Sequence, residues 1–333
     1  MLEVARAGAL RRLLPVALAV LVAGACAEQS RDPGVLRVGL LTPGSIRDGG
    51  WNQSAYEGLE RIRDELGAEV AHQETHTPQE FEDGFRDFAQ RGFDLVVGHG
   101  FEFQDAAVKV GAGYPDTVFL TTSGSAVRTN VAPIVFELEQ ATYVLGYTAA
   151  LLSRSVKLGL VGGVEIPSVA STFLAFEAGA LHARPGIDVV TTYIGNWSDV
   201  AAAREATRAL IDAGADVLIH NANEAARGFF QAVRESPRVY AFGTNRNQNE
   251  QAPESVIASA TLDVSQALLQ VARRVDAGRF EARLLRFGLR DRVIRVEWNE
   301  RLEPLLSARD RAAIEDLVHE IESGSFKVPR RDF

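Results

Sequence analysis

LRVGLLTPGSIRDGGWNQSAYEGL, residues 36–59, is the stretch that decides the fold class of this chain. Its apolar start, residues 36–41, is typical of a buried strand, and residues 42–50 form a polar, glycine-rich loop that leads to Trp51. A strand, a loop and a helix in this order open a parallel α/β layer. In such sheets ligands bind beyond the carboxyl ends of the strands, so this loop is the first place to expect a ligand.

A helix is expected after the loop, because apolar residues recur at helical spacing from Ala55 to Leu66. Asn52 or Ser54 can cap this helix by accepting a hydrogen bond from a free backbone N–H group. Trp51 stands at the mouth of the helix and has no partner in the local pattern. It therefore either covers the core or offers a stacking face to a flat ligand.

The alternation of strand and helix continues in two runs of about 100 residues each, which is a typical domain size. In the first run, strands are predicted at 69–73, 93–98 and 117–122, with helices at 79–91 and 105–112. After a helix at 138–154, the second run has strands at 158–163, 188–194, 216–220 and 239–242, with helices at 170–183, 199–213 and 225–234. Successive βα units build parallel sheets, so the chain is predicted to form two doubly wound α/β lobes.

The last 80 or so residues have a different pattern. A strand is predicted at 256–260, a helix at 265–276, an antiparallel strand pair at 284–288 and 293–298, and a helix at 308–323. Such a tail can return the chain to both lobes.

The amino terminus has the pattern of an export signal. Three arginines precede an apolar run, residues 13–25, which is shorter than the 18 or so residues of a membrane-spanning helix. The run ends in small residues before Cys26, the only cysteine, as in a bacterial lipobox, although Leu in place of Ala23 would be the stronger match. We predict a lipoprotein signal peptide at 1–26 with acylation of Cys26, which would tether the protein to the membrane on its extracytoplasmic face, and a flexible tether at 27–35. The alternative is an ordinary exported protein with a chance cysteine.

The charge of the chain argues against a nucleic-acid partner. Loss of residues 1–25 would remove three Arg and one Glu, so the formal charge would change from −9 to −11. An acidic chain repels phosphate backbones, and the sequence has no clustered basic face.

Aromatic and amide side chains gather where the predicted strands end. A planar ring held between aromatic faces, with amides at its edge, would use these residue types. The alternative is that loops carry Asn for turn geometry while Trp and Phe cover the cores, but the recurrence in both halves favours a site. Because Arg246 is the only basic residue nearby, a neutral heterocycle fits better than a sugar phosphate. The candidate ligand-binding residues are Trp51, Asn52, Phe101, Phe103, Ser123, Glu165, Trp197, Asn221, Asn223, Glu224, Thr244 and Asn245.

Motifs for enzyme chemistry are missing from the sequence. The glycine loops lack the GK[ST] of a phosphate-binding loop, no GxGxxG joins the first strand to its helix, and neither GxSxG nor HExxH occurs. No carboxylate cluster suggests a metal. We therefore predict a protein that is not an enzyme and that carries no cofactor or metal, and chemical turnover of its ligand by purified protein would contradict this.

Residues 51–59, WNQSAYEGL, resemble the SFNxSAxEGL segment of the basic membrane lipoprotein family, the purine-nucleoside-binding subunits of bacterial ABC importers. The likeness covers essentially the whole mature chain, and its segments together are specific for the family. The further segments are VGHGF at 97–101, GLVGG at 159–163, YIGNWSD at 193–199, GADV at 214–217 and GTNRNQ at 243–248, where the family commonly has GVDSDQ.

The resemblance implies a type I periplasmic-binding-protein fold, with two α/β lobes joined by three crossovers and a ligand cleft between them. We expect the N-terminal lobe to comprise 36–122 and 246–282, and the C-terminal lobe 123–245 and 283–333. One cleft between two lobes needs no second subunit, so a monomer is expected.

The chain departs from the family at the groups that hold ribose. Nucleoside-binding members use carboxylates and a lysine, whereas the matching positions here carry Thr42, Ser123, Asn245 and Ala260. The resemblance therefore implies a planar ring, with a bare purine base such as adenine as the first choice and a B6 vitamer or another small aromatic metabolite as the second. The implied partners are this small molecule and the permease subunits of an ABC importer. The alternative role is a ligand sensor that docks on a signalling receptor.

Overall fold

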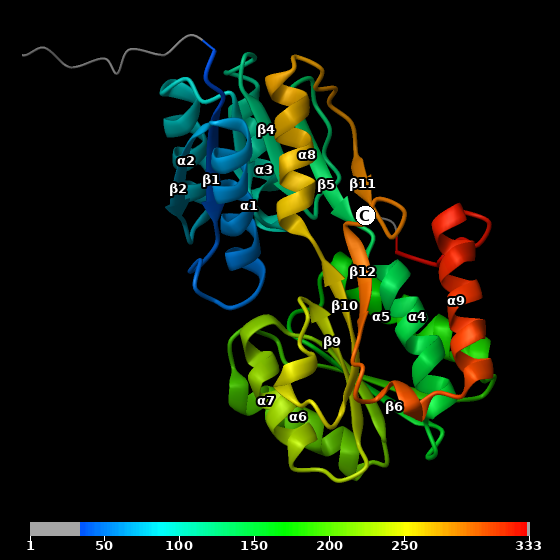
Figure 1. Cartoon of the computed structure of the whole chain (residues 1–333). Coiled ribbons are helices and arrows are strands. Elements are labelled where there is room, and N and C mark those ends of the chain that lie inside the picture. The colour runs from blue at the N-terminus through cyan, green and yellow to red at the C-terminus, as the bar shows by residue number, and fades with distance from the viewer. Residues whose placement is uncertain (1–33, 332–333) are drawn as a thin grey trace, which may run out of the picture. The chain divides into compact units, whose positions relative to one another are not determined.

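Two sheets of six strands each organise the described chain, which is residues 34–331 of a computed structural model (Figure 1). The predicted signal peptide with Cys26, and residues 27–33 of the predicted tether, lie outside the described residues. Within residues 34–331, no helix combines the length and the apolar character that crossing a membrane requires.

The first sheet has the strand order β11-β5-β4-β3-β1-β2, and all of its pairings are parallel. Helices cover both of its faces, with α1 and α8 on one side and α2 and α3 on the other. Its strands are β1 (Arg37–Thr42), β2 (Glu69–Glu74), β3 (Leu95–Gly98), β4 (Val118–Thr122), β5 (Val131–Phe136) and β11 (Leu285–Phe287). Its helices are α1 (Trp51–Leu66), α2 (Pro78–Gln90), α3 (Gln104–Gly111) and α8 (Val264–Asp276).

The second sheet has the order β12-β10-β9-β8-β6-β7 and is parallel except for β12, which pairs antiparallel with β10. Helices α4 and α5 pack on one face, and α6 and α7 on the other. Its strands are β6 (Lys157–Gly162), β7 (Asp188–Tyr193), β8 (Val217–Asn221), β9 (Tyr240–Asn245), β10 (Val256–Leu262) and β12 (Ile294–Trp298). Its helices are α4 (Leu138–Leu152), α5 (Pro167–Ala183), α6 (Val200–Asp212) and α7 (Ala226–Arg234), and α9 (Ala308–Ser323) packs on α4. The prediction of two doubly wound α/β lobes is confirmed.

The strand pairings place three segments in a different lobe from the predicted one. Residues 131–136, which were expected in the C-terminal lobe, form β5 beside β4 in the first sheet, and β11 joins the same sheet beside β5. Strand β10, expected in the N-terminal lobe, pairs with β9 in the second sheet. The predicted antiparallel pair at 284–288 and 293–298 is also wrong, because its two strands belong to different sheets. A short apolar run indicates a buried strand but not which neighbour completes its hydrogen bonds.

Three segments connect the two lobes, in agreement with the implied fold. The chain passes from β5 to α4 at Glu137, from β10 to α8 at Asp263, and from β11 to β12 through residues 288–293. These crossings are bonded to one another: Glu137 N–H donates to Phe287 O at 2.9 Å, and Asp263 N–H donates to Val293 O at 2.7 Å. The three segments therefore form one hydrogen-bonded hinge.

The start of α1 is capped differently from the prediction. Asn52 and Ser54 lie inside the helix, and neither caps it. The Asp48 carboxylate instead accepts hydrogen bonds from the backbone N–H groups of Gly50, Asn52 and Gln53, at 2.8, 2.9 and 3.1 Å. A carboxylate at a helix amino terminus satisfies free donors and complements the helix dipole, so Asp48 holds the loop and Trp51 in place.

Candidate functional site

A cavity of about 860 Å³ lies between the two lobes and brings together most of the predicted site residues. Its size is in the range of small-molecule sites. Nine of the twelve predicted residues line it, namely Trp51, Asn52, Phe101, Ser123, Trp197, Asn221, Asn223, Glu224 and Asn245. They come from both lobes and follow or end strands β1, β3, β4, β7, β8 and β9, because the carboxyl ends of parallel strands in each sheet face the cavity.

Trp51 is held from beneath by His99. The two rings are stacked with centroids 4.0 Å apart, and Phe136 meets the indole edge-on at 6.0 Å. His99 Nε2–H donates to Trp51 O at 3.0 Å, and Thr122 Oγ1–H donates to His99 Nδ1 at 3.2 Å. Burial lowers the pKa of His99 to about 3, so the ring is neutral. The indole is thus supported on one face while it lines the cavity.

Trp197 lines the cavity from the second lobe and packs against the backbone of Gly163. A Cβ atom at position 163 would lie 2.3 Å from the indole, so only glycine leaves room for the ring. Phe101, whose side chain is exposed, completes an aromatic set drawn from both lobes.

The amide side chains of the cavity have unused hydrogen-bonding capacity. Asn52 is buried, yet its Oδ1 atom has no partner among the described residues. Asn245 Nδ2 reaches Asn221 Oδ1 only at 3.5 Å, which is a weak contact. Buried polar atoms are nearly always bonded in folded proteins, so Asn52 Oδ1 is a candidate acceptor for a ligand N–H group.

Backbone strain is concentrated at the same place. Six non-glycine residues of the described chain have positive φ, and three of them line the cavity: Ser123 at 65°, Asn223 at 47° and Asn245 at 69°. Such conformations cost free energy and persist where surrounding structure enforces them, often at functional sites.

Three predicted site residues lie elsewhere. Phe103 is completely buried and packs on Phe81 in the core of the first lobe, with ring centroids 4.3 Å apart, so its assignment to the site is wrong. Glu165 is exposed, does not line the cavity and pairs with Arg331 at 3.6 Å. Thr244 lines a smaller neighbouring chamber. A helical turn after β3 directs Phe101 outward and Phe103 inward, which sequence adjacency does not reveal.

Two of the four positions matched to the family's ribose-binding groups line the cavity, and the other two are buried elsewhere. Thr42 is buried, donates to Gly44 O at 2.8 Å and contacts His72 Nε2 at 2.8 Å, and Ala260 is buried in β10. Only Ser123 and Asn245 of the four line the cavity.

The cavity also has lining residues that were not among the twelve predicted ones. Phe136 ends β5, a strand that was not predicted because Pro133 interrupts its apolar run. Asp48 and Glu102 bring carboxylates, and Arg47 is the one arginine or lysine that lines this cavity within the described chain. The polar loop around Asp48 was the available signal for that carboxylate.

An ion pair joins the lobes beside the cavity. Arg246, which follows β9, donates through Nη2 to the Glu57 carboxylate on α1 at 3.1 Å. The two residues belong to different lobes, so this contact forms only when the lobes approach each other.

A family model described as "ABC transporter substrate-binding protein PnrA-like" matches residues 35–332 of the chain. Basic membrane protein A2 of Borrelia garinii subsp. bavariensis is 27% identical over 308 residues, which are 90% of this chain and 88% of that protein. The transcriptional activator protein med of Bacillus subtilis is 26% identical and covers 81% of this chain and 84% of its own length. A solute-binding protein of an ABC transporter system from Conexibacter woesei is 28% identical, with a TM-score of 0.73 over 89% of this chain and 99% of that structure.

Proposed function

Because the chain belongs to the family of PnrA-like ABC transporter substrate-binding proteins, we propose that its cleft binds a small planar heterocycle of the purine class and presents it to a membrane permease. The ligand is a base such as adenine or a purine nucleoside. The family consists of binding proteins and not of enzymes, so the protein releases its ligand unchanged. One cleft suffices for this role, and the protein acts as a monomer outside the cytoplasm.

The aromatic and amide lining of the cleft is the observation that carries this proposal. Trp51, Phe101 and Trp197 reach the cavity from both lobes, and Asn52 offers an unpartnered oxygen at its wall. A flat ring stacked on these side chains can hold the lobes together, while amides bond its nitrogen atoms.

Isothermal titration calorimetry with adenine, adenosine, guanine and pyridoxal tests the ligand class. We expect saturable binding of at least one purine and no measurable binding of pyridoxal. Tight binding of pyridoxal alone would replace the purine by a B6 vitamer. If none of the four binds, the ligand class is wrong although the family stands.

A second role, ligand sensing, is favoured by one relative. The protein med of Bacillus subtilis is named a transcriptional activator, so the same architecture occurs under a regulatory name. Uptake of radiolabelled adenine by cells with and without this protein separates the roles. Loss of uptake without the protein supports transport, whereas unchanged uptake together with binding supports a sensor that docks on a signalling receptor.

Anchoring through Cys26 is the proposed means of keeping the protein at the membrane. Mass spectrometry of the membrane fraction should find a diacylated amino terminus at Cys26. The Cys26→Ser variant should move to the soluble fraction, because it lacks the lipid chains that supply the membrane affinity. A mature peptide that begins before Cys26 and lacks acylation would contradict this proposal.

A further inference from the structure

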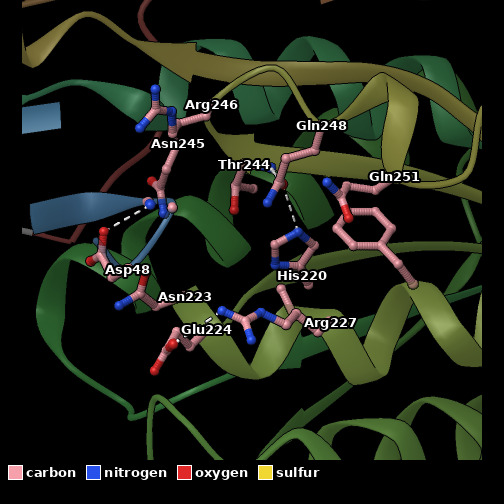
Figure 2. A pocket seen from close by; sticks show the side chains of 14 residues that line it. Asp48, His220, Asn223, Glu224, Arg227, Thr244, Asn245, Arg246, Gln248 and Gln251 are labelled. Carbon is pink, nitrogen blue, oxygen red and sulfur yellow. Dashed lines mark hydrogen bonds and ion pairs between the residues drawn. The ribbon is translucent and has the colours of Figure 1, made fainter. Parts of the chain in front are cut away.

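A small chamber of about 160 Å³ adjoins the cleft, and two buried polar groups in its wall have no role in the heterocycle site proposed above (Figure 2). It shares Asp48, Asn223, Glu224 and Asn245 with the larger cavity, so the two spaces meet along these side chains. His220 and Thr244 form its inner wall.

The two groups are unpartnered. His220 is 1% exposed and Thr244 is 2% exposed, yet His220 Nδ1 and Thr244 Oγ1 have no hydrogen-bond partner within residues 34–331. In Figure 2 the Thr244 hydroxyl and the free nitrogen of the His220 ring both point into the space above Asn223 and Arg227. Leaving buried polar atoms unbonded costs free energy, so both atoms favour an occupant that can bond them.

The neighbouring Gln248 determines the tautomer of His220. Thr244 N–H donates to Gln248 Oε1 at 2.9 Å, which identifies Oε1 as the amide oxygen. His220 Nε2 lies 2.9 Å from the same oxygen and must therefore carry the hydrogen. Burial lowers the pKa of His220 to about 4, so the ring is neutral and Nδ1 presents a lone pair. The chamber thus offers one acceptor, and beside it a hydroxyl that both donates and accepts.

The charges around the chamber are already paired. Arg227 pairs with Glu224 at 3.2 Å, Arg246 pairs with Glu57 at 3.1 Å, and Asp48 caps α1. Arg246 also has a buried, unpartnered Nη1 atom, but Figure 2 shows its guanidinium directed away from His220. The Nδ1 lone pair repels an anion, and the two carboxylates that line the chamber among residues 34–331, Asp48 and Glu224, already have partners. An uncharged O–H or N–H group is the complementary occupant.

We propose that this chamber is a second subsite of the cleft, in which His220 and Thr244 bind an uncharged hydroxyl or amide group that the ligand carries as a substituent on its ring. This inference rests on the proposed binding of a heterocycle in the larger cavity. It revises the preference for a bare base, because hydrogen-bonding groups for a substituent are present at positions other than those matched to the family's ribose-binding groups.

Calorimetry with adenine, adenosine and adenosine monophosphate tests the subsite. Adenosine should bind at least about tenfold more tightly than adenine, and the charged monophosphate should bind more weakly than adenosine. Thr244→Val keeps the shape but removes the hydroxyl, so it should weaken adenosine binding about three- to tenfold and leave adenine unchanged. Thr244→Ser, which keeps the hydroxyl, should restore most of the loss. The control is Thr207→Val in α6, whose hydroxyl bonds Ala203 O, and it should change neither affinity.

Equal affinity for adenine and adenosine in the unaltered protein, or an equal loss for both in Thr244→Val, overturns the subsite. If no purine binds, the proposed ligand class fails instead. The subsite is then tested by the melting temperatures of the ligand-free proteins. An unpartnered hydroxyl adds nothing to folding, so Thr244→Val should melt at or above the temperature of the unaltered protein. A clearly lower melting temperature would show that Thr244 is structural and would overturn the subsite by itself.

Discussion

Trp51→Ala should weaken adenine binding about tenfold to a hundredfold, because stacking on one aromatic face contributes roughly 1–3 kcal/mol per base. The surrounding residues fix the position of Trp51 at the cavity wall. His99 supports its ring, Asp48 caps the helix that begins with it, and its side chain lines the cavity. Titration calorimetry measures the loss, and the ligand-induced change in tryptophan fluorescence should shrink in the same variant.

The alternative is that Trp51 is mainly a lid over the core. In that case the substitution should lower the free energy of unfolding by roughly 3–5 kcal/mol and leave affinity intact in the folded fraction. Because the indole packs on His99 and Phe136, we expect a small loss of stability along with the loss of binding. Trp298→Ala on β12 is the matched control, since Trp298 is half-buried and lies away from the cavity lining. Trp298→Ala should lower the melting temperature without changing affinity. If Trp51→Ala gives this same result, a lower stability with unchanged affinity, the stacking role of Trp51 is refuted.

Glu139→Gln should make the protein more stable at pH 8 by up to about 3 kcal/mol and leave it nearly unchanged below pH 5. Glu139 is 4% exposed in the first turn of α4, beside the crossing at Glu137. Desolvation by burial raises the pKa of its carboxyl from the ordinary 4.5 to about 7; the nearby Glu137 charge adds to this effect, and the Arg330 and Arg286 charges oppose it. The folded state therefore retains a proton that the unfolded chain loses between pH 4.5 and 7. Stability falls as pH rises through this window, and glutamine removes the loss because it never ionises.

Urea denaturation at pH 5 and pH 8 measures this effect as a difference between the two midpoints. Glu315→Gln, at an exposed position of α9, is the control for simple loss of a charge, because water solvates that side chain in both the folded and the unfolded state. A parallel pH dependence of the unaltered protein and Glu139→Gln would show that the buried carboxyl is not the group that titrates.

The kinds and order of the elements followed from local patterns. The apolar positions of Phe81, Phe85 and Phe88 recur at helical spacing, and all three are buried in α2. Asp199 directly precedes α6 in the sequence and caps it, because its carboxylate accepts a hydrogen bond from Ala202 N–H at 2.9 Å. Strand ends could be located in the same way, and since parallel strands direct their carboxyl ends to one edge, nine predicted residues meet at one cavity.

The sequence by itself determined the βα alternation, the family and the edges of the sheets at which a ligand is expected, because each depends on residues close together along the chain. Only the tertiary structure decided that β10 belongs to the second sheet and that Phe103 faces the core. It also decided that His220, Thr244 and Gln248 form one hydrogen-bonded wall. Pairing between strands and contacts between side chains from separate elements depend on how distant segments satisfy one another's hydrogen bonds and fill one another's space. Periodicity reports which face of a segment is buried, and carries no information about the partner that buries it.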